Sequence, residues 1–118
     1  MNIGKNHKAV EERELLMSIE IITTEELDKK LQAGEKLELV DVREDEEVAQ
    51  GMIPGAKHIR MMTIPENLDY FDKEKEYIFI CRSGNRSQNV CYYMQDQGYK
   101  VRNMVGGMLD WTGEVEFK

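Results

Sequence analysis

The sequence predicts an α/β domain whose largely parallel sheet is covered by helices on both faces. Short apolar runs, typical of parallel strands buried on both faces, alternate along the chain with segments of helical pattern. A length of 118 residues suits a single domain with one hydrophobic core. No internal repeat, low-complexity tract or proline-rich linker divides the chain. We therefore expect one α/β unit.

The N-terminal segment differs from the rest of the chain. Residues 1–16 are polar and charged and carry no strand signal. We expect them to form a flexible N-terminal extension ahead of a domain that spans residues 17–118. Met17 begins a segment that looks like an ordinary protein start. We expect it to be the natural initiator, which N-terminal sequencing of the cellular protein would test.

The first strand and helix are expected close to the start of this domain. Ile19–Ile22 is an apolar run typical of a strand. Thr24, followed by two glutamates, matches a helix start, and Gly34 matches the end of that helix. The next apolar run, Leu37–Val42, predicts a second strand.

The middle of the chain carries weaker signals. We interpret the acidic run Glu44–Glu47 as a solvated first helical turn, where carboxylates are favourable. Proline and glycine predict a turn at Ile53–Ala56, before the short stretch Lys57–Ile59. Pro65–Phe71 predicts a helix or a turn.

The last third of the chain repeats the strand and helix pattern. Tyr77–Ile80 predicts a compact apolar strand, and Ser87–Gln97 predicts a helix that Gly98 closes. Lys100–Val105 predicts the last strand, which runs into Gly106–Gly107.

The charge balance limits the partners that we expect. A net charge of −7 disfavours nucleic-acid phosphates and anionic membrane surfaces as the main partner. No apolar run approaches the length of a transmembrane helix, and the N-terminus lacks the pattern of a secretion signal. We expect a cytoplasmic protein with no nucleic-acid partner and no membrane partner. An anionic ligand then has to be attracted by positive charge close to its site.

The cysteines and histidines narrow the chemistry. The only two cysteines, Cys81 and Cys91, match neither a CxxC redox motif nor a zinc site. The two histidines, His7 and His58, have no partner at metal-ligand spacing, so we expect surface or turn residues and no metal. No histidine is placed to act as the base of a cysteine protease, and a reactive cysteine must therefore be activated electrostatically. We expect Cys91 to be a core packing residue.

The segment Cys81–Ser87 has the pattern of an anion-binding loop. Cys81 follows the expected strand directly, and the loop after it holds Gly84 and two arginines before a helix begins. Gly84 allows backbone N–H groups to turn inward, and the helix N-terminus adds partial positive charge. We therefore expect a populated Cys81 thiolate. Arg82 or Arg86 would neutralise an anionic donor, and Ser87 suits the helix N-cap.

Two other interpretations of this loop remain open. Cys81 could be a small buried apolar residue, although two arginines and a glycine around an inert thiol argue against that. A cysteine-dependent phosphatase or arsenate reductase is the other alternative. Only four residues separate Cys81 from Arg86, one fewer than in cysteine-based phosphatases, and the tighter ring suits a single sulfur better than a phosphoryl group.

The sequence resembles the single-domain members of the rhodanese family of sulfurtransferases from Met17 to Trp111. Cys81–Ser87 is similar to the active-site loop of that family, Asp41–Glu44 to its upstream motif, and Gly51–Ala56 to its Gly-His-Ile-Pro-Gly-Ala turn. Gly106–Gly107 with Trp111 resembles its terminal signature. Met52 departs from the pattern, because the family commonly has histidine there.

The resemblance implies a rhodanese-like fold, with a five-stranded parallel sheet flanked by helices. It also implies a sulfurtransferase without a cofactor, in which Cys81 alternates between thiolate and persulfide. A small anionic donor such as thiosulfate, or a small persulfide, would supply the sulfur, and a thiol, cyanide or a protein acceptor would remove it. The substrate-binding candidates are Arg82, Ser83, Gly84, Asn85, Arg86 and Ser87. The alternative is a rhodanese-like binding module without catalysis.

Asp41 and Arg43 are second-tier site candidates. In the implied architecture, the strands ending at Val42 and Val105 neighbour the strand ending at Cys81, which brings Arg43 to the same rim of the sheet. We favour a structural ion pair between Asp41 and Arg43 over direct contact of these residues with substrate.

Overall fold

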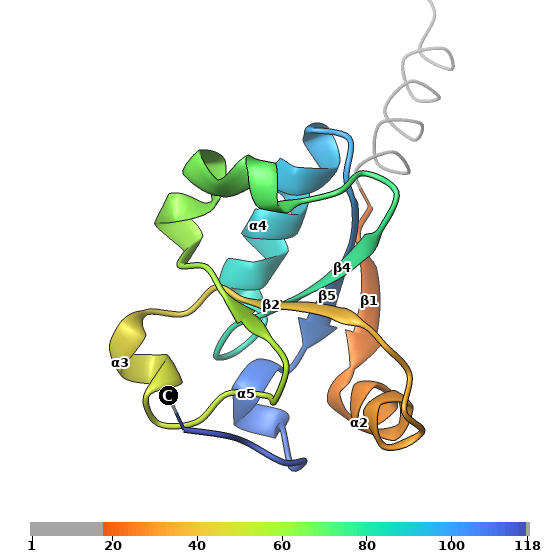
Figure 1. The fold of residues 1–118 in the computed structure, drawn as a ribbon, viewed down its shortest axis with the longest axis vertical. Coiled ribbons are helices and arrows are strands. Elements are labelled where there is room, and N and C mark those ends of the chain that lie inside the picture. The colour runs from red at the N-terminus through yellow and green to blue at the C-terminus, as the bar shows by residue number, and fades with distance from the viewer. Residues whose placement is uncertain (1–17, 118) are drawn as a thin grey trace, which may run out of the picture.

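The computed structural model describes residues 18–117 and contains one sheet of five parallel strands, as the sequence predicts (Figure 1). The predicted N-terminal extension and the predicted initiator Met17 lie outside the described residues. The strands pair in the order β1-β5-β4-β2-β3. They are β1 (Glu20–Thr23), β2 (Glu38–Asp41), β3 (Lys57–His58), β4 (Glu76–Ile80) and β5 (Lys100–Val105). The helices are α2 (Thr24–Gln32), α3 (Asp45–Val48), the 3-10 segment η1 (Met61–Tyr70), α4 (Asn85–Asp96) and α5 (Gly107–Asp110).

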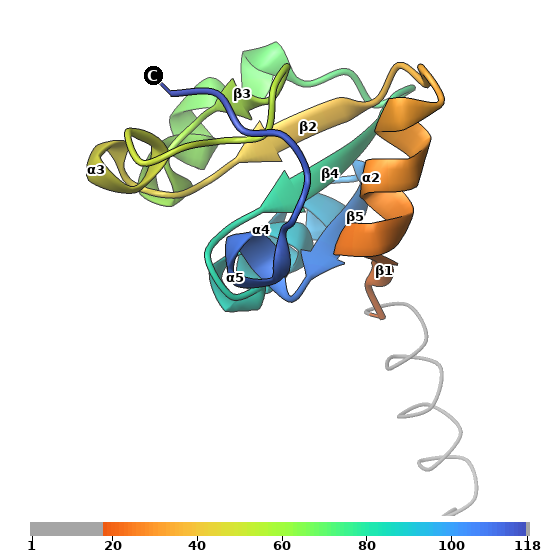
Figure 2. The same cartoon turned by 90° about the horizontal axis from the view of Figure 1, so that it is seen from below.

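The side chains of β4 show how this sheet is covered on both faces. Alternate residues of a strand point to opposite faces, so Tyr77 and Phe79 lie on one face and Ile78 and Ile80 on the other. The first face packs against α4 and η1, and the second packs against α2 and α5 (Figures 1 and 2). All four side chains are buried, which explains why the strand reads as a continuous apolar run.

The first helix begins where the sequence predicts. Thr23 is its N-cap and accepts a hydrogen bond from the Glu26 N–H at 3.1 Å, while the Glu26 carboxylate accepts one from the Thr23 N–H at 2.9 Å. This reciprocal capping satisfies two backbone donors that a helix start leaves free. The helix packs Leu27, which is fully buried, against the sheet.

Two expected elements differ in the structure. The segment predicted as a helix or turn at Pro65–Phe71 is a longer 3-10 helix that starts at Met61. His58 was expected at the surface or in a turn, but it lies in the short strand β3 with its side chain almost covered. Its Nε2 atom lies 2.7 Å from the carbonyl oxygen of Arg43, and this hydrogen bond explains why a polar ring is accommodated there.

The C-terminal segment returns across the sheet edge toward β3 (Figure 2). Met52 and Glu116 form an antiparallel bridge, with N–H···O distances of 2.9 and 2.8 Å. The Met52 side chain is buried, so the position where the family commonly has histidine is a packing position in this chain. Among residues 18–117, no helix is both long and apolar enough to cross a membrane.

Candidate active site around Cys81

Cys81 lies directly after β4, at the carboxyl edge of the sheet, where ligands of open parallel sheets bind. The strands on either side of β4 are β5 and β2, as predicted. The Cys81 Sγ atom accepts hydrogen bonds from the backbone N–H groups of Gly84, at 3.0 Å, and Ser87, at 3.3 Å. The cysteine is buried, and its sulfur faces the loop amides, as the sequence predicts for an anion-binding loop.

Glycine is required where α5 packs against this loop. The N–H groups of Met108 and Leu109 donate to the carbonyls of Cys81 and Arg82, each at 2.9 Å. A Cβ atom on Gly107 would lie 2.4 Å from the Arg82 carbonyl oxygen, which is closer than any side chain can approach. Gly107 therefore lets the backbone of α5 hold the backbone of the Cys81–Ser87 segment, called the sulfur loop below.

Ser87 does not cap the helix, and this part of the prediction is wrong. Gly84, with φ of 99°, is the N-cap, and α4 starts at Asn85, so Ser87 lies inside the first turn. Its N–H points at the Cys81 Sγ atom, which accepts from the first turn as a capping oxygen does at other helices. The sulfur therefore sits at the positive end of the α4 dipole.

The Ser87 hydroxyl connects the sulfur to Asn103. Ser87 Oγ lies 3.2 Å from the Cys81 Sγ atom and also donates a hydrogen bond to Asn103 Oδ1. The Asn103 amide nitrogen donates to the Gly84 carbonyl at 3.0 Å and to Gln88 Oε1 at 2.8 Å. These bonds fix the orientation of Asn103, so that its oxygen faces the hydroxyl. By rotating about its C–O bond, the hydroxyl can change the acceptor of its hydrogen bond from Asn103 Oδ1 to an ionised sulfur.

Asn103 is a candidate site residue that the sequence analysis missed. It stands in β5 between the apolar residues Val101 and Val105 on the same face, and it is buried. A polar residue on a buried strand face needs a hydrogen-bond partner, so an asparagine in this apolar strand could have been recognised as a candidate site residue. The partner itself could not be read from the sequence, because it lies on the helix of the neighbouring β4–α4 unit.

Arg86 and Glu47 form a two-pronged ion pair between α4 and α3. Nη1 and Nη2 of Arg86 donate to Oε1 and Oε2 of Glu47, each at 2.7 Å. The hydrogen bonds from Arg86 lower the pKa of Glu47 from its usual 4.5 to about 2. The hydrogen bond and charge of Glu47, together with the charge of Cys81, raise the pKa of Arg86. Glu47 was expected to belong to a solvated helical turn, and this pairing with the sulfur loop was not anticipated.

The predicted ion pair between Asp41 and Arg43 is present. Arg43 Nη2 lies 2.8 Å from Asp41 Oδ2, and Arg43 Nε lies 3.0 Å from Asp41 Oδ1. Arg43 also donates to the Gly51 carbonyl at 2.8 Å. Both side chains are buried, so the pair is a structural link between the end of β2 and the turn before β3.

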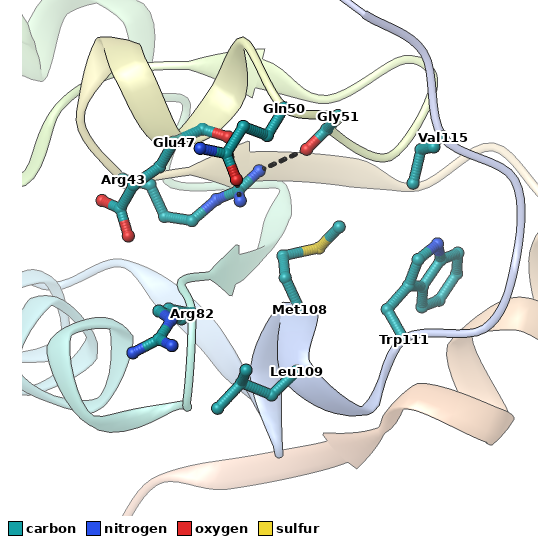
Figure 3. Close-up of a pocket in the computed structure, with 9 residues that line it drawn as sticks. All are labelled: Arg43, Glu47, Gln50, Gly51, Arg82, Met108, Leu109, Trp111 and Val115. Atoms are coloured by element: carbon teal, nitrogen blue, oxygen red, sulfur yellow. Dashed lines mark hydrogen bonds between the residues drawn. The ribbon is translucent and has the colours of Figure 1, made fainter.

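The other predicted loop residues, Arg82, Ser83 and Asn85, are exposed to solvent. Arg82 borders a pocket of about 290 Å³ beside the loop. Figure 3 shows Arg43, Glu47 and Gln50 on one side of this pocket, facing Met108 and Leu109 of the α5 segment. The complete lining is Arg43, Glu47, Gln50, Gly51, Arg82, Met108, Leu109, Trp111 and Val115. The pocket therefore combines charged groups with apolar groups.

Cys91 lies in the core, as the sequence predicts. It is fully buried on α4 among the apolar side chains between that helix and the sheet. Burial, with a smaller contribution from the charge of Cys81, raises the pKa of the Cys91 thiol to about 12. A thiol with this pKa is almost entirely protonated at neutral pH and is a poor nucleophile.

The comparisons with known proteins agree with this fold. A family model described as a rhodanese-like domain matches residues 23–114. "Putative sulfurtransferase YtwF" of Bacillus subtilis (strain 168) is 58% identical over 86% of this chain and 99% of its own length. "Sulfurtransferase" of Allochromatium vinosum is 41% identical over 77% of this chain and 86% of its own length. A rhodanese-like domain protein from Staphylococcus aureus superposes with a TM-score of 0.80 at 44% identity, covering 85% of this chain and 99% of that structure.

Proposed function

The chain belongs to the rhodanese-like domain family, and on that premise we propose that it is a sulfurtransferase that carries sulfur as a persulfide on Cys81. The observation that supports this most directly is the convergence of the Gly84 and Ser87 amides on the Cys81 Sγ atom. Hydrogen-bond donors around a sulfur atom favour its ionised form, which is the nucleophile in sulfur exchange. The names of the two curated relatives agree with this activity.

The first step loads the sulfur. The Cys81 thiolate attacks the outer sulfur of a donor such as thiosulfate, and a new S–S bond forms while the S–S bond of thiosulfate breaks. Sulfite leaves with the bonding electron pair, and the enzyme retains a persulfide anion. A small persulfide donor would react in the same way and release a thiolate. The loop amides stabilise the negative charge before and after the step, and this is the role we assign to Gly84 and Ser87.

The second step unloads the sulfur. The nucleophilic acceptor, a thiolate or cyanide, attacks the outer sulfur of the persulfide, and the Cys81 thiolate leaves with the electron pair. No net oxidation occurs over the cycle, so the chemistry is complete without an electron carrier. A protein that carries a reactive cysteine is a further candidate acceptor, since the relative YrkF of Bacillus subtilis is named a putative sulfur carrier protein.

The test is sulfur loading measured by mass spectrometry. After incubation with thiosulfate and removal of the excess, we expect the intact protein to gain the mass of one sulfur atom and to lose it again on addition of cyanide. The Cys81→Ser variant should gain nothing. Cys91→Ser is the matched control, because this cysteine lies in the core and should not affect loading.

The alternatives give different outcomes in the same experiment. If neither thiosulfate nor a small persulfide loads the wild-type protein, the binding-module alternative is favoured. Hydrolysis of an aryl phosphate that depends on Cys81 would instead favour the phosphatase alternative.

A further inference from the structure

The ion pair between Arg86 and Glu47 raises a question about donor binding. Arg86 lies in the sulfur loop, in the first turn of α4, and its guanidinium group contacts Glu47, which lines the pocket beside the loop. Nη1 and Nη2 both donate to the Glu47 carboxylate at 2.7 Å. Glu47 thus occupies the two terminal nitrogens of Arg86 that would otherwise donate hydrogen bonds to the oxygens of a sulfur donor.

The surrounding charges do not replace Arg86. Arg43 donates to Asp41 and to the Gly51 carbonyl within 3.0 Å, and to the Glu47 carbonyl at 3.4 Å. Among the described residues that line the pocket, Arg82 is the cation whose side chain makes no ion pair. Glu47 borders the same pocket and adds a negative charge to it. Among the described residues, a donor with two negative charges therefore meets one guanidinium without an ion-pair partner, while Arg43 and the Glu47 carboxylate in the pocket wall are already paired.

We propose that Glu47 determines donor specificity by competing with anionic donors for the guanidinium group of Arg86. This inference rests on the proposed function and adds a substrate class to it. The resting site favours sulfur donors that carry a single negative charge, such as small persulfide anions, over the thiosulfate dianion. Glu47 acts through Arg86 and is a positioning residue.

Two donors with the same chemistry allow a clean test. Thiosulfate is a dianion, and methanethiosulfonate is a monoanion in which a methyl group replaces one oxygen. In both cases the Cys81 thiolate attacks the outer sulfur, the S–S bond breaks, and sulfite or methanesulfinate leaves with the electron pair. The ratio of kcat/KM for the two donors therefore measures how strongly the site discriminates against the second negative charge of thiosulfate.

The test variant is Glu47→Gln, which keeps the shape of the side chain. Its amide oxygen can still accept the hydrogen bond that Glu47 Oε1 accepts from the Glu44 N–H at 2.9 Å. We expect the KM for thiosulfate to fall about threefold to tenfold, the KM for methanethiosulfonate to fall less, and kcat to stay within about twofold for both. Glu46→Gln is the control. Glu46 is exposed and does not contact Arg86, and this substitution removes the same charge from the neighbouring position.

A double-mutant cycle separates competition from a general charge effect. In the Arg86→Ala background, Glu47→Gln should change the ratio of the two kcat/KM values much less, because there is no guanidinium left to release and only the direct effect of the Glu47 charge on the pocket remains. An equal change in both backgrounds would overturn the competition. An unchanged or lower preference for thiosulfate in Glu47→Gln would overturn the competition. An equal gain in Glu46→Gln would overturn it too. These results leave the proposed function intact. If thiosulfate, methanethiosulfonate and a small persulfide all failed to load sulfur on the wild type, that function and this inference with it would be refuted.

Discussion

At the scale of single residues, the site depends on how one hydroxyl group is shared. The Ser87 Oγ atom stands between the Cys81 Sγ atom, 3.2 Å away, and the Asn103 side chain. When Cys81 is ionised, the hydroxyl can donate to the sulfur, and this third donor joins the two backbone amides. Ser87 therefore contributes its backbone and its side chain to the same atom.

We expect Ser87→Ala to slow the loading of Cys81 by about tenfold or more, because it removes one donor from a preorganised anion site. It also leaves the Asn103 carbonyl oxygen without its donor, which should cost about 1–3 kcal/mol of stability. Rapid-mixing measurements of persulfide formation and urea unfolding measure the two effects. Ser83→Ala, an exposed position in the same loop, should slow loading less. Equal losses for both variants would contradict a specific role of the Ser87 hydroxyl.

The sequence identified some of these residues and missed others for a physical reason. Cys81 and Gly84 could be predicted because their roles are local, in one short loop between a strand and a helix. Asn103 and Glu47 act through contacts with residues 16 and 39 positions away in the chain, and no spacing rule reports such pairs. The prediction that Ser87 is the N-cap failed for a related reason. The Cys81 sulfur, from a residue outside the helix, accepts the hydrogen bond that a capping oxygen would accept.

At the scale of elements, the close approach of α5 to the sulfur loop makes Gly107 essential. A Cβ atom there would meet the Arg82 carbonyl at 2.4 Å and the Cys81 carbonyl oxygen at 2.7 Å, and backbone atoms cannot rotate away. We expect Gly107→Ala to lower the free energy of unfolding by about 2–4 kcal/mol, from overpacking and from its φ of +60°. Sulfur loading should be lost as the loop shifts. Urea unfolding and the mass spectrometric assay measure both outcomes.

Gly34→Ala is the matched control for this prediction. Gly34 also has a positive φ, of +82°, but a Cβ atom there would meet nothing within 4 Å. We expect a cost of about 1 kcal/mol from the backbone conformation alone, with loading unchanged. If the two variants had the same free energy of unfolding, the close approach of α5 to the sulfur loop would not explain the need for glycine at position 107.

The boundaries of most elements could be predicted within one or two residues. β4 is an almost continuous buried apolar run, β5 is bounded by glycines, and α2 carries capping and closing signals, so local physics determines them. The 3-10 segment η1 was less well predicted. Its i to i+3 geometry has no strong hydrophobic period, and its packing of Ile64 against the α4 face of the sheet decides its structure.

At the scale of the whole molecule, the ion pair between α3 and α4 couples stability to pH. Arg86 lowers the pKa of Glu47 from 4.5 to about 2 in the folded state. The unfolded state therefore binds a proton more readily, so this stabilisation is fully present above about pH 4.5 and is lost as the pH falls toward 2. We expect the stability difference between wild type and Glu47→Gln to be constant above pH 4.5 and to shrink below it.

Thermal unfolding of both proteins between pH 2.5 and 7 measures this difference, a range chosen to span the shift. Glu46→Gln is again the comparison, since it removes an exposed carboxylate that is not paired with Arg86. Parallel curves for wild type and Glu47→Gln over the whole range would show that the ion pair does not stabilise the fold.

The α/β class followed from alternating runs, but the sheet order did not. Strand pattern alone predicts parallel strands covered on both faces, and the two apolar clusters on opposite faces match it. The number of strands came with the family resemblance. The position of β1 beside β5 depends on contacts between the two ends of the domain, which no local pattern encodes.

The bridge between Met52 and Glu116 has a consequence for engineering. It places Val115 on the pocket wall, next to Gly51. A Cβ atom added to Gly51 would lie 3.3 Å from the Val115 side chain. The outer wall of the pocket is thus supplied by a tail that belongs neither to the sheet nor to the sulfur loop. Redesign of that tail should therefore reshape the pocket for bulkier molecules without changing the residues that contact the Cys81 sulfur.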